Sequence, residues 1–160
     1  MVKHLTLLLF VLLIGCEINS EQLIKSENIN YENIKFNAVS KDLKFTNNQD
    51  SPDVEIAKKL INEWFNNNIK IDGFDGNLSV DVTSIEINKI KKKEYYRIEV
   101  DMNIEFSETN ETLNKRKIYK INSIEYADIE GNFSIKDTEN LNKNTISKSL
   151  KSINQKILGM

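Results

Sequence analysis

The sequence predicts an α+β domain with the element order β-α-β-β-β-α, in which one mostly antiparallel four-stranded sheet carries two helices on one face. Three observations predict this fold class. Six apolar residues alternate with polar ones from Tyr96 to Phe106, the period-two pattern of a strand with one buried face. Apolar residues recur at helical spacing after Ser51 and again near the C-terminus. The last three predicted strands are joined by hairpin-sized connections, which favours an antiparallel meander with both helices on its apolar face.

The first fifteen residues, 1–15, have the pattern of a secretory signal peptide. A short basic start is followed by an apolar run from Leu5 to Ile14, and Gly15 then precedes the only cysteine, Cys16. An apolar run of about ten residues is too short to cross a membrane as a helix. The pattern therefore predicts export, with cleavage between Gly15 and Cys16.

Residues 16–32 are polar and show no sustained apolar period, so they are predicted to form a flexible tether. The sixteen residues after Cys16 would span about 20–25 Å on average if flexible. The alternative is that part of this segment adds a strand to the edge of the sheet. Residues 33–160 are expected to form a single α+β domain.

The first strand of this domain is predicted around Ile34, Phe36 and Ala38, which alternate with polar residues. Residues 40–51 have the composition of a loop, although Leu43 and Phe45 also fit a continuation of the strand past a bulge.

The first helix is predicted to begin after Ser51. Ser51 can cap the exposed amides, Pro52 fits the first turn, and Asp53 suits the positive end of the helix dipole. The helix should end near Asn67, and residues 72–77 form a turn. Its predicted buried stripe consists of Val54, Ala57, Leu60, Ile61, Trp64 and Phe65.

Three strands follow. The first spans residues 78–87, with a β-bulge at Thr83 and Ser84 where the alternation slips by one residue. Residues 89–94 connect it to the strand 96–106, and a turn over 107–112 leads to a fourth strand, 118–126, with a less regular alternation.

Phe133 and Ile135 fit an extension of the fourth strand past Gly131. Asp137 or Thr138 can cap the last helix. The predicted buried stripe of this helix consists of Leu141, Ile146, Leu150, Ile153 and Ile157.

The charge balance argues against a nucleic-acid partner. The chain has 22 basic and 24 acidic residues, and removal of residues 1–15 leaves a formal charge of −3. No strong field of one sign is therefore available to attract nucleic acid. Asn, Ile and Lys make up about 40% of the chain, a skew that AT-rich codons explain, so runs of Lys and Asn were expected to carry little functional meaning.

The stretch Leu13-Ile14-Gly15-Cys16 resembles the lipobox of bacterial lipoprotein precursors. This resemblance implies a diacylglyceryl group on the sulfur of Cys16 and an acyl chain on its amine, which together hold a protein stably on a membrane. Glu17, where an aspartate would suggest inner-membrane retention, favours the outer membrane, facing the periplasm. A soluble secreted protein and an uncleaved membrane anchor are the alternatives.

The processed chain would lack the residues of common catalytic and metal sites. The only histidine is removed with residues 1–15, and acylation would convert the only thiol to a thioether. The sequence therefore predicts no catalytic residue, no metal site, no cofactor and no enzymatic activity. Glu99, Asp101 and Glu105 share one face of a strand, which is interpreted as an exposed polar face rather than a cation site.

Basic residues are the candidates for contacts with a partner. Lys91, Lys92 and Lys93 are predicted at one end of the meander and Arg116 at the other. The chain has only two arginines, Arg97 and Arg116, so codon bias does not explain them. Arginine and lysine can bind phosphate or acidic groups of a glycolipid.

The element order on a chain with a lipobox is similar to that of lipopolysaccharide-assembly lipoproteins and of auxiliary lipoproteins of envelope transport systems. The landmarks are the Ser-Pro helix start, the run Tyr96 to Phe106 and the terminal amphipathic helix. The expected function is a lipid-anchored, non-catalytic binding or scaffold domain of the cell envelope with a protein partner. The alternative is a periplasmic carrier of a glycolipid or small molecule, with a cavity between sheet and helices, and a hydrolase is a third hypothesis.

Overall fold

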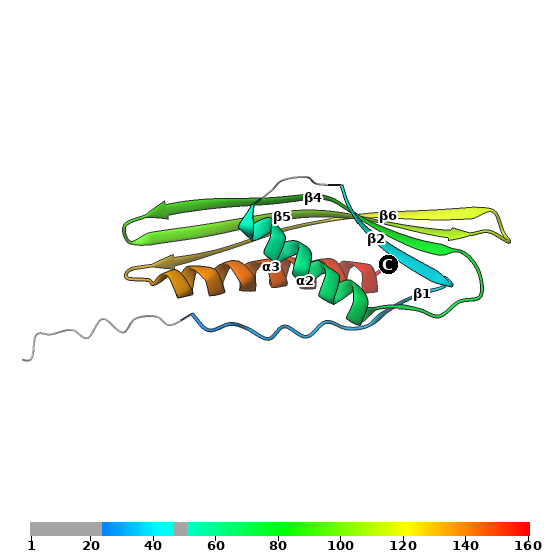
Figure 1. The fold of residues 1–160 in the computed structure, drawn as a ribbon, viewed down its shortest axis with the longest axis horizontal. Coiled ribbons are helices and arrows are strands. Elements are labelled where there is room, and N and C mark those ends of the chain that lie inside the picture. The colour runs from blue at the N-terminus through cyan, green and yellow to red at the C-terminus, as the bar shows by residue number, and fades with distance from the viewer. Residues whose placement is uncertain (1–23, 47–50) are drawn as a thin grey trace, which may run out of the picture.

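The computed structural model describes residues 24–46 and 51–160. The predicted signal peptide, Gly15, Cys16 and residues 16–23 of the predicted tether lie outside the described residues. The described elements, shown in Figure 1, are β1 (Ile34–Phe36), β2 (Ser40–Phe45), α2 (Pro52–Asn68), β3 (Ile69–Ile71), β4 (Asn77–Lys92), β5 (Tyr95–Asn110), β6 (Lys115–Glu130) and α3 (Ile135–Leu158).

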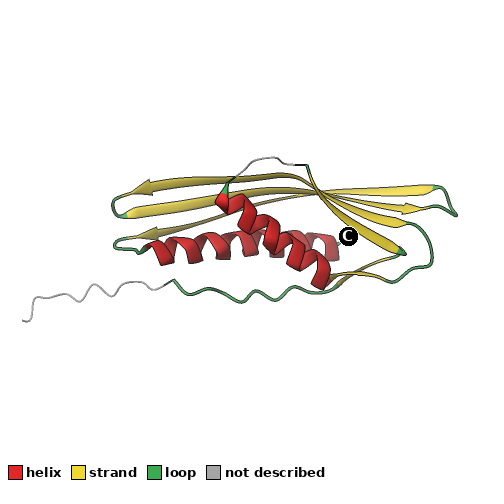
Figure 2. Cartoon of the chain, in the orientation of Figure 1, coloured by secondary structure: helices red, strands yellow, loops and turns green. Residues whose placement is uncertain are grey.

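The predicted fold class is confirmed. Four strands form one sheet in the order β2-β4-β5-β6, in which β2 runs parallel to β4 and the other neighbours are antiparallel. The short strands β1 and β3 pair in parallel and form a separate two-stranded sheet. Figure 2 shows both helices on the same side of the large sheet, and the two helices also contact each other.

The core lies between the large sheet and the helices, and β5 runs through its middle. The apolar residues of the predicted run from Tyr96 to Phe106 all face the helices and are buried. Phe106 stacks on Phe36, with ring centroids 5.9 Å apart, and meets Trp64 edge-on at 6.3 Å. Aromatic residues from β1, α2 and β5 therefore join in one cluster.

The predicted bulge is present in β4. The pairing register with β5 shifts between Val82 and Ser84, so both flanking apolar sets face the core. Thr83, the extra residue, is exposed and donates a hydrogen bond from Oγ1 to the backbone oxygen of Asn103.

Two short strands differ from the sequence-based expectation. Residues 40–45, assigned to a loop by composition, form β2, in which Leu43 pairs with Val80 and Phe45 with Val82. β3 directly follows α2 and was not predicted. Both strands depend on pairing with segments about 35 residues away, which local alternation does not reveal.

The long hairpins extend further than predicted. The connection between β4 and β5 is confined to Lys93 and Glu94 instead of residues 89–94. The burial of β6 alternates regularly from Tyr119 to Glu130, so Ile124 and Tyr126, at 57% and 68% exposure, lie on the face away from the helices. The irregular alternation expected there reflects three exposed apolar residues, Ile118, Ile124 and Tyr126, and not a second bulge.

α3 begins earlier than predicted. Ser134 is the N-cap, and its hydroxyl accepts from the backbone N–H of Asp137 while the Asp137 carboxylate accepts from that of Ser134. This reciprocal capping box places Ile135 in the first turn of the helix instead of in β6. At α2, the predicted cap by Ser51 is present, since its hydroxyl accepts from the backbone N–H of Val54 at 3.2 Å.

Candidate binding surfaces

The N-terminal segment of the described chain is held along α3. The backbone N–H of Ile24 donates to Asp137 Oδ1 at 3.1 Å, and Asn140 Nδ2 donates to the backbone oxygen of Ile24 at 2.7 Å. Residues 24–32 form no strand, and Figure 1 shows them running beside α3. These residues are therefore held by side chains of α3 and take no part in the sheet.

Asn144 also binds this segment, and its side-chain amide makes hydrogen bonds to the backbone as a neighbouring β-strand would. Its Oδ1 accepts from the backbone N–H of Glu27 and its Nδ2 donates to the backbone oxygen of Lys25, both at 2.9 Å. The buried side-chain amide thus satisfies one backbone donor and one backbone acceptor. Further along, the Tyr31 hydroxyl donates to the backbone oxygen of Ser147 at 3.3 Å.

The carboxylate of Asp137 joins the start of α3 to the N-terminal segment. Hydrogen bonds from the side chain and the backbone of Ser134, and from the backbone of Ile24, lower the pKa of Asp137 below its ordinary value. The ionised carboxylate also lies at the positive end of the helix dipole.

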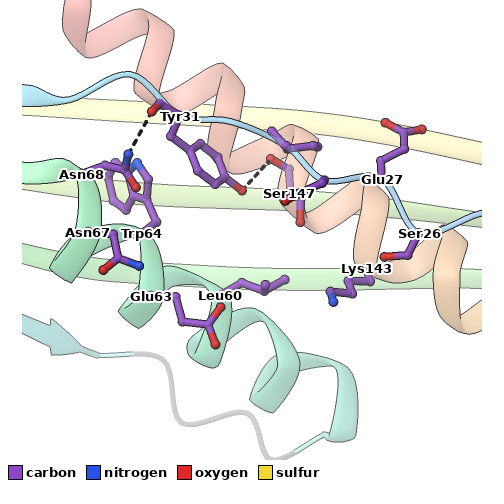
Figure 3. Close-up of a pocket in the computed structure, with 12 residues that line it drawn as sticks. Ser26, Glu27, Tyr31, Leu60, Glu63, Trp64, Asn67, Asn68, Lys143 and Ser147 are labelled. Carbon is purple, nitrogen blue, oxygen red and sulfur yellow. Dashed lines mark hydrogen bonds between the residues drawn. The ribbon is translucent and has the colours of Figure 1, made fainter.

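A groove lies between the N-terminal segment, α2 and α3. Its volume is about 360 Å³, and Figure 3 shows Tyr31 crossing it from the segment toward Ser147, with Glu63 on α2 and Lys143 on α3 near its mouth. Asn68 Nδ2 donates to the backbone oxygen of Tyr31 at 2.9 Å, and burial raises the pKa of the Tyr31 hydroxyl. The polar, open lining suits a small polar molecule better than an acyl chain.

The space between the sheet and the helices is filled. Eight large residues expected to line a carrier's cavity are each at most 8% exposed; they are Phe36, Trp64, Phe65, Tyr96, Met102, Phe106, Ile146 and Ile153. A hollow of about 300 Å³ lies at one end of this core, beside Phe36, Phe106 and the C-terminal end of α3. A glycolipid carrier with a central cavity would need space that these side chains occupy.

The three candidate lysines lie together at one end of the molecule. Lys91, Lys92 and Lys93 form the end of β4 and its turn, and they border a hollow of about 440 Å³ with Phe133 and the first turn of α3. The turn and the N-terminus of α3 are far apart in the sequence. The fold therefore adds exposed apolar side chains to the predicted basic cluster.

Arg97 lies on the face of the sheet that the helices leave uncovered. Its guanidinium pairs with Asp128 at 2.7 Å and lies over the rings of Tyr126 and Tyr95, 5.4 and 5.8 Å from their centroids. The hydrogen bond to Asp128 raises the pKa of Arg97. Arg97 and the flanking tyrosines form a cation–π cluster, a residue combination that is enriched at protein interfaces.

Arg116 does not join this cluster. Its Nε donates to Ser107 Oγ at 2.8 Å, and it pairs with Thr109 across the hairpin. Twelve residues of β5 separate Thr109 from Arg97, or about 40 Å of strand. Arg97, by contrast, pairs with Ile90, directly before Lys91. The predicted candidates therefore lie at two ends of the molecule, with Arg97 and the three lysines at one end and Arg116 at the other.

The predicted acidic row is part of a hydrogen-bonded polar face. Asp101 Oδ1 accepts from Asn122 Nδ2 at 2.6 Å and from Asn103 Nδ2 at 3.3 Å. Glu105 pairs with Lys120 at 3.3 Å. Within residues 24–46 and 51–160, no group of three or more His, Cys, Asp or Glu side chains is placed to hold a metal ion.

Sequence reasoning missed the apolar part of the uncovered face. Ile90, Ile124 and Tyr126 are exposed there: Ile90 pairs with Arg97, and Tyr126 and Ile124 lie two and four residue pairs further along the β5–β6 hairpin. The signal that could have found them is the register of the β5–β6 hairpin, which pairs Arg97 with Asp128.

Among the described helices, neither is long and apolar enough to cross a membrane.

Replacing Asn144 with alanine should release the N-terminal segment from α3. Two hydrogen bonds to a part-buried backbone are lost, at a cost of about 1–3 kcal/mol, while alanine keeps the helix intact. Trypsin should then cleave after Lys25 faster than in the unsubstituted protein. Asn66→Ala, at an exposed position of α2, is the control, and equal cleavage rates in the two variants would contradict the role of Asn144.

Comparisons with known proteins give no family for the chain. No protein-family model matches the sequence, and no curated protein matches it with significance. Among solved structures, a minor lipoprotein from Acinetobacter baumannii is similar with a TM-score of 0.42 and 13% identity, over 74% of this chain and 90% of that one.

Two further structures show similarity at the same level. A protein of the DUF330 family from Xanthomonas campestris matches with a TM-score of 0.45 and 9% identity, over 84% of this chain and 88% of that one. The rare lipoprotein B from Shewanella oneidensis matches with a TM-score of 0.36 and 10% identity, over 75% of this chain and 97% of that one. Two of the three are lipoproteins by name, but at such TM-scores the similarities indicate no function for this chain.

Proposed function

We propose that the chain is a lipid-anchored lipoprotein of the cell envelope that acts as a non-catalytic binding or scaffold domain for an envelope protein. The anchor is the lipid on Cys16, supported by the apolar run and the sequence Leu13-Ile14-Gly15-Cys16. The proposed location is the outer membrane, with the domain facing the periplasm. A role in outer-membrane or lipopolysaccharide assembly is supported only by the resemblance in element order.

The uncovered face of the large sheet carries the binding role in this proposal. Ile90, Arg97, Ile124 and Tyr126 lie on three successive rungs across β4, β5 and β6. This patch combines an arginine, an aromatic ring and two aliphatic side chains, all of them accessible. Aromatic residues and arginine are the types that contribute most to protein interfaces.

The free edge of β6 adds to this surface. In the described sheet β6 pairs only with β5, so the outward backbone groups of this sixteen-residue strand have no strand neighbour. α3 packs against part of β6, and its Lys156 Nζ donates to the backbone oxygen of Asn122 at 2.6 Å. Such an edge can accept an added strand from another protein. Two residues of the patch, Ile124 and Tyr126, lie on this edge strand, so the patch and the edge can serve one partner.

Crosslinking in cells tests the binding role. A photo-crosslinking amino acid at Tyr126 should give a discrete adduct with an envelope protein, and Arg97→Ala should reduce its yield. The same amino acid at Lys59, exposed on α2, is the matched control. Adducts of equal yield and identity from both positions, or none from Tyr126, would contradict the proposal.

The anchor is tested separately by Cys16→Ala. This variant should accumulate as unprocessed precursor without a lipid label, because the acylated sulfur is missing. Mass spectrometry of the native protein should show acyl chains on an N-terminal Cys16. Normal processing of the variant, or a native amino terminus that carries no lipid, would contradict lipid anchoring.

A small-molecule carrier is the second candidate function, and the groove beside Tyr31 and Lys143 is the feature that favours it. The groove is lined mainly by polar side chains, so the ligand class it suits is a small polar molecule. The filled core argues against acyl chains as cargo.

A further inference from the structure

One end of the molecule combines exposed apolar and basic side chains. Lys91, Lys92 and Lys93 project from the β4–β5 turn beside the first turn of α3, where Ile135 is 75% exposed and Lys136 follows it. Glu94 and Glu130 also lie at this end, and Asp137 and Glu139 lie in the first two turns of α3, so the four lysines share this end with four carboxylates, of which Asp137 is buried. The name lysine end is used for this surface: Lys91, Lys92, Lys93, Ile135 and Lys136.

The opposite end has a similar composition. The β5–β6 hairpin carries an exposed Leu113, followed by Lys115, Arg116 and Lys117. β5 connects the two ends, and its sixteen residues span about 50 Å at roughly 3.3 Å per residue. Composition alone therefore does not say which end faces a membrane.

The path of the N-terminal segment decides between the two ends. Ile24 is hydrogen-bonded to Asp137 and Asn140, in the first two turns of α3, and therefore lies near the lysine end. Eight residues separate Ile24 from Cys16, and they reach at most about 29 Å even when fully extended. A lipid on Cys16 thus lies within reach of the lysine end, whereas the hairpin at Leu113 is nearly twice that distance away.

We propose that the lysine end rests on the anionic surface of the membrane that holds the Cys16 lipid. The lysines contact phosphate headgroups, and Ile135 enters the interface between headgroups and acyl chains. The β5–β6 hairpin then points away from the bilayer. This proposal depends on acylation of Cys16 and adds to it the orientation of the domain.

The test uses the mature acylated protein in vesicles of phosphatidylcholine with and without phosphatidylglycerol. An environment-sensitive fluorophore is attached to Ile135→Cys or, as the matched control, to Leu113→Cys; acylated Cys16, the only native cysteine, does not react. The probe at position 135 should shift to the blue and be quenched by nitroxide-labelled lipid when phosphatidylglycerol is present. The probe at position 113 should show neither change.

Charge removal provides the second arm. Replacing Lys91, Lys92 and Lys93 together with glutamine should abolish the dependence on phosphatidylglycerol at position 135. Replacing Lys115, Arg116 and Lys117 in the same way should leave it unchanged. All six side chains are exposed, and circular dichroism checks that both variants are folded.

The outcomes separate the orientation from the anchor. Equal quenching at positions 113 and 135, or quenching at 135 that ignores phosphatidylglycerol, would overturn the orientation while the lipid anchor stands. Mass spectrometry of the same preparation that shows no acyl chain on Cys16 would overturn the anchor, and the orientation with it.

Discussion

Replacing Trp64 with alanine is expected to lower the free energy of unfolding by about 3–5 kcal/mol. The side chain is 1% exposed and meets the ring of Phe106 edge-on. Its Nε1 donates a buried hydrogen bond to Asn154 Oδ1 at 2.8 Å. Truncation therefore removes a large apolar surface, leaves a cavity and deprives a buried acceptor on α3 of its donor.

Urea unfolding followed by circular dichroism measures this loss, because the substitution removes the only tryptophan and its fluorescence. Trp64→Phe should retain part of the packing and isolate the effect of the missing N–H, at about 1–3 kcal/mol. Phe74→Ala is the control for aromatic truncation, since Phe74 is fully exposed and should change stability little. A Trp64→Ala variant as stable as Phe74→Ala would contradict the packing described for α2.

Gly76→Ala should destabilise the domain by more than about 3 kcal/mol and prevent folding if the native stability is small. Gly76 has a φ of 83°, which any residue with a Cβ adopts at a cost of about 1 kcal/mol. A Cβ at this position would also lie 1.8 Å from the backbone oxygen of Thr109. The backbones of Gly76 and Thr109 cannot move apart freely, because hydrogen bonds hold them. The backbone N–H of Val39 donates to the backbone oxygen of Gly76, and that of Asn77 donates to the Thr109 hydroxyl.

Gly131 provides a matched control for this second substitution. Its φ of 85° is nearly the same, but nothing lies within 4 Å of the position that a Cβ would take. Gly131→Ala should therefore cost only the backbone strain, about 1 kcal/mol. Thermal or urea unfolding of both variants gives the difference due to the contact with Thr109, and equal losses would contradict that close approach.

The sequence predicted those elements whose signal is local. The alternation of β5, the bulge in β4 and the Ser51 cap of α2 depend on neighbouring residues, and all three are present. The strands β2 and β3 depend on partners far along the chain, so their own three to six residues were too short a signal.

The N-terminal segment shows a different limit of sequence reasoning. Its polar composition is typical of a flexible tether, and codon bias explains why asparagine is frequent in the chain. Asn140 and Asn144 nevertheless bind the backbone of Ile24, Lys25 and Glu27, more than a hundred residues earlier. A compositional bias explains why asparagine is frequent but not where each side chain is used.

Of the candidate contacts, the three lysines and Arg116 are exposed and Arg97 is half-buried, and their neighbours could not be predicted from the sequence. Arg97 acquires Tyr126 and Asp128 only through pairing of β5 with β6. Lys91, Lys92 and Lys93, in the β4–β5 turn, lie beside Ile135 only because the start of α3 packs against this turn. Whether any of them contacts a partner remains a prediction.

Two buried amides of α3 also determine how this helix can move. Asn142 accepts from the hydroxyl of Tyr96 on β5, and Asn154 accepts from the indole of Trp64 on α2, both at 2.8 Å. Twelve residues separate them, which is about 18 Å along the helix axis. If the helix slid or rotated by one position, both hydrogen bonds would break and both buried amide oxygens would lose their donors. The two hydrogen bonds should therefore hold α3 in one register against both α2 and the sheet.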